Sequence, residues 1–153
     1  MDKKVKSIYN SILEVSLRIL IILANTEEPK SVEEIAVIDF MSVYGHEFDI
    51  YDCNLHGDNY YMYGESAARL EKTRKALEEL ILRNMVEIIP DKFGFRYAAT
   101  VPGRVFSKTL NSSFALDYEK CSNLAEEKVT TKGLPFVQKL ITAKAKQSIE
   151  ESN

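Results

Sequence analysis

Most of the side chains that could do chemistry lie in one segment, from Gly45 to Gly64. Two histidines and a cysteine occur there among carboxylates, and these residue types can hold a metal ion. The histidines are ten residues apart, however, so they share no helical face, and this spacing resembles no known zinc pattern. We therefore favour a solvated acidic loop whose histidines bond to the backbone or to neighbouring carboxylates; a small metal-dependent enzyme is the weaker alternative. The polar side chains of this segment are His46, Glu47, Asp49, Asp52, Cys53, His56 and Asp58.

The common catalytic motifs are absent from this sequence. It has no glycine-rich phosphate-binding loop, no nucleophile elbow, no HExxH and no paired CxxC. Cys53 and Cys121 have neither metal-ligand nor disulfide-framework spacing, which fits plain thiols in a reducing compartment. We expect a protein that is not an enzyme and that uses no cofactor and no small-molecule substrate.

Basic residues offer a second kind of chemistry, contact with the phosphates of DNA. Arg69, Lys72 and Lys75 recur at intervals of three and could share a helix face, as in the recognition helix of a helix-turn-helix. Lys92 would lie at the tip of a following hairpin, and Arg96 on its second strand. Glutamates interrupt the helical series, however, and can form ordinary surface pairs with the basic residues. A solvated helix face is at least as well supported as a phosphate track.

The distribution of charge favours a protein partner. The net charge is −3, and the pI is about 5.5. Residues 25–64 hold nine acids and one base, a net of −8, whereas residues 65–96 hold seven bases and six acids, a net of +1. A dedicated DNA-binding domain usually carries a basic surplus, so this balance argues against strong sequence-independent binding to DNA.

Aromatic side chains mark two candidate contact surfaces. A compact domain rarely carries a loop as long as the Gly45 to Gly64 segment unless the loop has a function, although its tyrosines could simply tether it to the core. A later helix carries an apolar stripe that could pack on the body or receive a partner. The predicted partner-binding residues are Phe48, Tyr51, Tyr60, Tyr61, Tyr63, Phe114, Tyr118 and Cys121.

The elements that must position these residues begin with two helices. Apolar residues at alternating steps of four and three predict a helix over about Ser7 to Ala24. It is apolar on nearly every side by its end, which predicts a central core helix with Glu14 and Arg18 on its remaining wet face. Ser31 and Glu34 form a capping-box pattern that starts a second helix, expected to end near Gly45.

The stretch from Ala67 to Tyr97 gives the clearest structural signal. A charged amphipathic helix stops at Asn84 and leads into two strand-like runs, Met85–Ile89 and Phe95–Ala98, which are joined by a loop over Pro90–Gly94. A helix followed by such a hairpin is the pattern of a winged helix. The expected fold class is mainly α with a small β-hairpin: a winged-helix (winged helix-turn-helix-like) domain with appended C-terminal helices.

The length of 153 residues, with 45% hydrophobic content, suits one core domain plus appended helices. We predict a core over residues 1–100 with an inserted loop at 45–64, helices over 101–130 that pack on it, and a short amphipathic segment with a frayed tail over 131–153. Thr100, Val101, Pro102 and Gly103 form the expected start of the first appended helix. The longest apolar run, Ile19–Ala24, is shorter than the roughly 20 residues of a membrane span, so we expect a cytoplasmic protein.

A series of short motifs occurs along the chain in a fixed order. The motifs are Asn10-Ser11, Leu13-Glu14-Val15, Leu17-Arg18, Asp39-Phe40, Leu55-His56, Tyr63-Gly64-Glu65 with Arg69 and Glu71, Leu77, Leu80, Met85-Val86-Glu87 and Tyr97-Ala98-Ala99-Thr100. This order resembles a known family, the type-two middle component of ABC-three-component systems, which are Lamassu-like bacterial anti-phage operons. The resemblance covers about Asn10 to Val129, and the sequence departs from the family pattern at Asn84, at Gly57 and over Ser66–Ala68.

This resemblance implies a small non-enzymatic adaptor. Such a subunit would join an SMC-like ABC ATPase, which senses foreign or broken DNA, to an effector such as a nuclease that is held inactive until triggered. Contact of this subunit with DNA would then be indirect. The alternative is a winged-helix transcription regulator that binds its own promoter as a homodimer.

Overall fold

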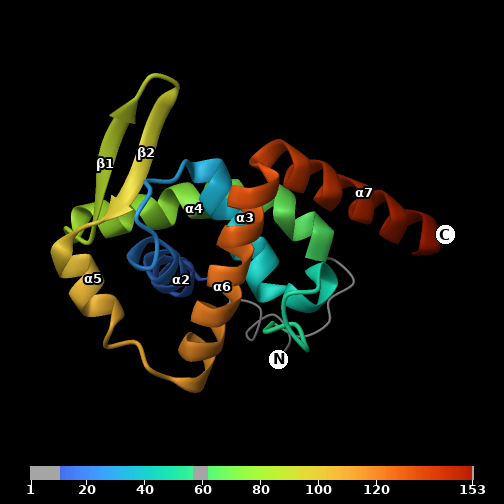
Figure 1. Cartoon of the computed structure of the whole chain (residues 1–153), viewed down its shortest axis with the longest axis horizontal. Helices are drawn as coiled ribbons and strands as arrows, with labels where there is room; N and C mark the ends of the chain where they lie inside the picture. Colours follow the sequence, from blue (N-terminus) through green and yellow to red (C-terminus); the bar gives the residue numbers. More distant parts are fainter. Residues whose placement is uncertain (1–10, 57–61, 153) are drawn as a thin grey trace.

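The computed structural model describes residues 11–56 and 62–152 (Figure 1). Helices dominate, and the only regular sheet within the described residues is one antiparallel hairpin, so the predicted mainly α class with a small hairpin is confirmed. The elements in chain order are α2 (Ile12–Ala24), α3 (Val32–Val43), the 3₁₀ turn η1 (Gly45–Phe48), α4 (Met62–Leu82), β1 (Val86–Asp91), β2 (Gly94–Ala99), α5 (Val101–Ser107), α6 (Ser113–Lys132) and α7 (Leu134–Ser152).

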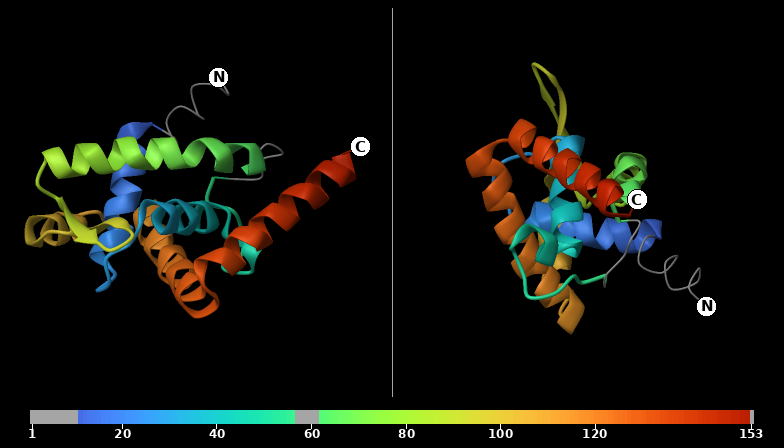
Figure 2. Two further views of the ribbon diagram at one scale, coloured as in Figure 1. Left: turned by 90° about the horizontal axis from the view of Figure 1, so that it is seen from above. Right: turned by 90° about the vertical axis from the view of Figure 1, so that its right-hand side faces the viewer.

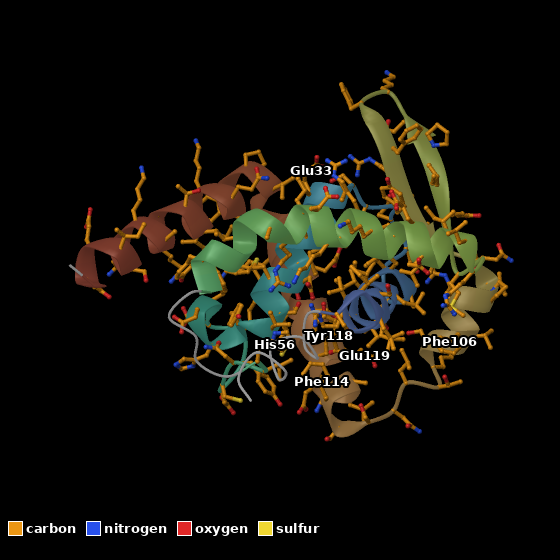
Figure 3. All side chains as sticks on the ribbon, turned by 180° about the vertical axis from the view of Figure 1, so that it is seen from behind. Glu33, His56, Phe106, Phe114, Tyr118 and Glu119 are labelled. Carbon is orange, nitrogen blue, oxygen red and sulfur yellow. The ribbon has the colours of Figure 1, made fainter. Side chains whose placement is uncertain are left out.

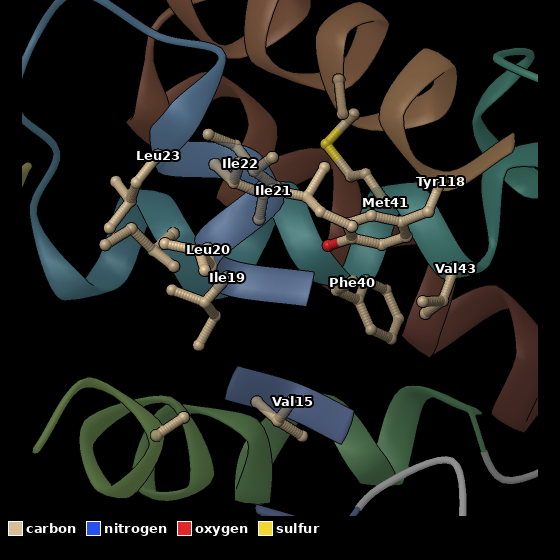
Figure 4. Packing of buried hydrophobic residues seen from close by; sticks show 14 of the residues in the cluster. Val15, Ile19, Leu20, Ile21, Ile22, Leu23, Phe40, Met41, Val43 and Tyr118 are labelled. Atoms are coloured by element: carbon tan, nitrogen blue, oxygen red, sulfur yellow. The ribbon is translucent and has the colours of Figure 1, made fainter. Parts of the chain in front are cut away.

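Helix α2 forms the centre of the core, as its nearly continuous apolar sequence predicts. Ser11 caps it by accepting a hydrogen bond from the Glu14 N–H, so the described helix starts at Ile12, and residues 7–10 lie outside the described residues. Its buried side chains pack against α4, α5 and α6. Figure 4 shows side chains of this helix, among them Ile21 and Ile22, in one buried cluster with Phe40 and Met41 of α3.

Local capping sets the boundaries of the next helices. The capping box at the start of α3 is confirmed, because Ser31 and Glu34 each accept the other's backbone N–H. Helix α4 begins at Met62, five residues before the predicted Ala67, so the inserted loop is shorter than expected. After α4, Asn84 adopts a left-handed conformation with φ of 60°, which turns the chain into the hairpin.

The hairpin strands reach further than predicted. The register pairs Val86 with Ala99 and continues to Asp91 with Gly94, so only Lys92 and Phe93 form the turn. The φ of 133° at Gly94 suits glycine and lets the second strand begin directly after this turn. A feature that sequence reasoning missed is an antiparallel bridge between Lys30 and Tyr97, which ties the base of β2 to the segment before α3.

The C-terminal helices wrap around this core. Helix α6 packs against α3 and α2, and Gly133 then redirects the chain into α7. The prediction of a frayed tail is wrong, because α7 continues to Ser152; no glycine or proline follows Pro135 in this helix. Figure 2 shows that α7 crosses the body and continues past it. None of the described helices is long and apolar enough to span a membrane.

Candidate functional site: a buried charge network and an exposed hairpin face

A buried carboxylate, Asp39 of α3, holds the helices together. Its side chain is 0% exposed. Arg18 of α2 donates from Nε to Oδ1 at 2.8 Å and from Nη2 to Oδ2 at 3.2 Å. Arg69 of α4 pairs with the same Oδ2, and the hydroxyl of Tyr118 on α6 donates to Oδ1 at 2.7 Å. Asp39 therefore links α3 to α2, α4 and α6. Arg18 is fully buried, so its predicted place on a wet helix face is wrong.

The charges of this network compensate one another. Burial alone would raise the pKa of Asp39, but the guanidinium groups of Arg18 and Arg69 outweigh it and hold that pKa well below its usual range. Burial would also lower the pKa of Arg18, yet the adjacent Asp39 carboxylate raises it. For Tyr118, burial and the Asp39 carboxylate raise the pKa well above its ordinary value. The phenol is therefore neutral at pH 7 and serves as a hydrogen-bond donor.

His56 closes this network on the side of the loop. Its Nε2 lies 3.4 Å from Nη1 of Arg18, and its ring stacks on Phe114 with centroids 6.1 Å apart. Figure 3 labels these two side chains together with Tyr118. Burial, and then the charge of Arg18, lowers the pKa of His56 to about 3. His56 is therefore a neutral, half-buried side chain that packs on Phe114 and lies beside Arg18. Within residues 11–56 and 62–152, no three His, Cys, Asp or Glu side chains gather where they could hold a metal ion.

Because burial keeps His56 neutral, we expect stability to fall as the pH decreases. The pKa of this side chain is near 6.5 in an unfolded chain and about 3 in the folded protein. Between these values the unfolded chain binds the proton first, so acid favours unfolding; the loss from this group between pH 7 and pH 5 should be about 1–2 kcal/mol. Urea unfolding at both pH values checks this. The variant His56→Gln should lose correspondingly less stability, and an equal loss in both proteins would contradict the assignment.

The loop before α4 is tethered to the core, as one of the two interpretations of its aromatic residues predicts. The Phe48 side chain is buried against Phe40, with ring centroids 5.9 Å apart, and its carbonyl accepts a hydrogen bond from Lys128 at 3.1 Å. The Tyr63 ring also lies against Phe40, with the ring centroids 6.0 Å apart. A hydrogen bond to Asp117 of α6 raises the pKa of Tyr51. Tyr60 and Tyr61 lie outside the described residues.

The aromatic stripe of α6 is also internal. Tyr118 and Cys121 are fully buried, and Phe114 is half-buried between His56 and Tyr118. Burial raises the pKa of the Cys121 thiol to about 11, which makes it an unreactive thiol. The expectation that Phe48, Tyr118 and Cys121 offer an exposed contact surface is therefore wrong, because these side chains complete the core. A partner contact by the partly exposed Tyr51 stays a prediction.

The predicted DNA-contact residues do not form one surface. Arg69 is 5% exposed and bound to Asp39, so it cannot reach a phosphate. Each step of three along a helix turns the side chain by about 60°, so Lys72 is partly exposed and only Lys75 is fully on the surface. Arg96 is held by carboxylates, at 2.7 Å from Asp91 and 2.9 Å from Glu34. Lys92 is exposed at the hairpin turn.

The hairpin carries a surface that sequence reasoning did not single out. Phe93 at its turn is 93% exposed, Phe95 is 63% exposed and Ile88 is 44% exposed. The register pairs Pro90 with Phe95 and Ile88 with Tyr97, which places Ile88, Pro90 and Phe95 on one face of the strands. We call Ile88, Pro90, Phe93 and Phe95 the hairpin apolar face. The signal available in the sequence was the apolar residues at every second position, Ile88 and Pro90 in the first strand and Phe95 and Tyr97 in the second. Figure 1 shows the hairpin standing away from the helical body.

Comparison with protein families decides what kind of chain this is. The model of the ABC-three component (ABC-3C) system Middle Component 2 matches residues 8–151. The chain belongs to this family. The match to Middle Component 2 includes the buried network, the hairpin and α7. No curated protein and no solved structure matches the chain significantly. As a middle component, the protein is one part of a system with other subunits.

Proposed function

We propose that this middle component is a non-enzymatic, cytoplasmic adaptor of an anti-phage defence complex. It would bridge an SMC-like ABC ATPase that senses DNA and an effector subunit of nuclease type. Membership of the family supports a place in a multi-component system. The observation that carries the adaptor role is the hairpin apolar face, with Phe93 almost completely exposed at its tip.

The chemistry of the hairpin favours a protein partner over DNA. Soluble proteins rarely leave several large apolar side chains together in water unless another molecule covers them. Exposed phenylalanines on a projecting hairpin are suited to fill pockets in a partner, where such anchors dominate the binding energy. Lys92 is a single exposed base at the turn, and Arg96 is already compensated by Asp91 and Glu34. The surface therefore lacks the clustered positive charge that phosphate binding requires.

The order of elements supports a winged-helix interpretation of the fold. Helices α2, α3 and α4 precede the hairpin, and the bridge between Lys30 and Tyr97 supplies a third extended segment at the base of the sheet. In this proposal the hairpin is a wing that has exchanged contact with DNA for contact with a protein. Helix α4 corresponds to the recognition helix in this interpretation. Its Arg69 pairs with the buried Asp39, so this side chain belongs to the core.

The double variant Phe93→Ser with Phe95→Ser tests the adaptor role. Removing two exposed aromatic anchors should weaken the complex with one of the other two components of the same operon by about 100-fold or more. Binding of the purified full-length chain to each component can be measured by biolayer interferometry. The unfolding temperature should be unchanged, because both side chains lie in solvent.

A matched control replaces two exposed leucines on α6. Leu116→Ser with Leu124→Ser removes two apolar side chains that are 48% and 47% exposed on a different part of the molecule, and it should leave binding unchanged. If the hairpin variant binds both components with wild-type affinity, the hairpin apolar face is not the contact and the argument for an adaptor loses its support.

The second candidate is a winged-helix transcription regulator acting as a homodimer. The exposure of Lys75 and Lys92 on the predicted DNA-facing elements is the observation in its favour. This candidate requires that the isolated chain bind a short promoter duplex, with an affinity that falls steeply as salt increases. An electrophoretic mobility assay at low and moderate salt separates the two functions, because the adaptor needs no DNA contact of its own.

A further inference from the structure

Two adjoining cavities form a groove along α7. The inner cavity, of about 290 Å³, lies between α3, α4 and α7, and Phe40, Arg69 and Ile141 are among its lining residues. The outer cavity, of about 480 Å³, follows α7 from Pro135 to Lys146. Gln138 and Thr142 line both cavities, so the two join along one face of the helix. We call this combined surface the α7 groove.

We infer that the α7 groove receives an acidic amphipathic helix from another component of the system. The inference rests on the proposed function, since it identifies a second contact surface of the adaptor. The inner part offers apolar contacts from Val37, Phe40 and Ile141. The outer part carries Lys139 and Lys146, and none of its described lining residues is acidic. A segment with apolar side chains on one face and carboxylates at its edge complements both parts.

The dimensions of the groove fit a helix. Pro135 and Lys146 are eleven residues apart on α7, which corresponds to about 17 Å at a helical rise of 1.5 Å per residue. Lys139 and Lys146 are two turns apart on one face. An antiparallel or parallel partner helix with carboxylates seven residues apart would meet both lysines, while its apolar residues at intervening turns enter the inner cavity.

The position of the groove suits the second surface of an adaptor. Figures 1 and 2 show the hairpin at one end of the molecule, whereas α7 runs from the middle of the molecule toward the other end. A partner on the hairpin apolar face would therefore leave the α7 groove open for another partner. The charged network borders the groove, because Arg69 lines the inner cavity and also binds Asp39.

Two variants with different chemistry test this inference. Thr142→Trp places a bulky side chain where the cavities join, and Lys139→Glu with Lys146→Glu reverses the charge of the rim. Each of the two other components, purified separately, is the probe in biolayer interferometry at about 50 and about 300 mM salt. We expect both variants to weaken binding of the same component by about tenfold or more. The charge variant should lose most at the lower salt, where attraction between charges is screened least.

The control is Lys108→Glu with Lys120→Glu, which makes the same change in net charge at exposed positions outside the groove. It should bind like the wild type. Circular dichroism should show unchanged unfolding temperatures, because Lys139, Thr142 and Lys146 are exposed; if Thr142→Trp unfolds, Ala143→Trp replaces it. If the groove variants bind both components with wild-type affinity, the inference is overturned, but the proposed function is not affected. Absence of any complex with the wild type would overturn the proposed function, and the inference with it.

Discussion

Replacing Asp39 with alanine should lower the free energy of unfolding by about 3–5 kcal/mol, because it leaves buried guanidinium groups without their carboxylate. Arg18 is fully buried and has a bidentate contact with Asp39, and Arg69 pairs with the same carboxylate from another helix. Water cannot replace these contacts while the core stays closed. Urea unfolding followed by circular dichroism at pH 7 would measure the loss.

The matched control for this prediction is Glu33→Ala. Glu33 lies on the same helix, α3, but its side chain is exposed, so its removal should cost no more than about 0.5–1 kcal/mol, including its favourable place in the first helical turn. Tyr118→Phe removes only the neutral donor, and a loss of about 1–2 kcal/mol is expected. Combined with Asp39→Ala it should add little, since both changes remove the same hydrogen bond. A loss below 1 kcal/mol for Asp39→Ala would show that the network is not the stabilising link described above.

The burial of the residues in this network could not be predicted from the sequence. The apolar pattern of the helix predicts that Arg18 lies with Glu14 on its remaining wet face, and charged side chains are usually solvated. The partner of Arg18 is 21 residues away on another helix, and that pairing depends on how the helices cross, which periodicity does not define. The same limit applies to Tyr118, because an apolar stripe does not say whether it faces the core or a partner.

Features set by neighbouring residues were predicted correctly. Ser31 and Glu34 form the capping box, and the chain leaves α4 at Asn84, where a left-handed conformation turns it toward the hairpin. These outcomes depend on a few adjacent side chains and on the backbone. The hairpin apolar face depends in addition on what covers each strand face, so the sequence predicted the strands but not the exposure of Phe93 and Phe95.

The glycine in α5 shows how a correct local prediction can miss a tertiary constraint. Thr100 caps the helix, as expected, by accepting the N–H of Gly103 at 3.0 Å. A Cβ added to Gly103 would lie 2.1 Å from the carbonyl oxygen of Met85. That oxygen also accepts the N–H of Thr100 at 3.0 Å, so the carbonyl cannot move away without weakening this bond. The sequence pattern indicated a helix start, but the close approach requires glycine.

Gly103→Ala should therefore destabilise the protein by about 2–3 kcal/mol, because the base of the hairpin and α5 must separate to admit a methyl group. Gly64→Ala is the matched control. Gly64 lies in α4, with no atom within 4 Å of an added Cβ, so this change should stabilise the protein by about 0.5–1 kcal/mol through a lower entropy of the unfolded chain. Thermal and urea unfolding of both variants would measure the difference. If both variants gained stability, the contact between Gly103 and Met85 would not constrain the fold, and the position of the hairpin would have to depend on the bridge between Lys30 and Tyr97 instead.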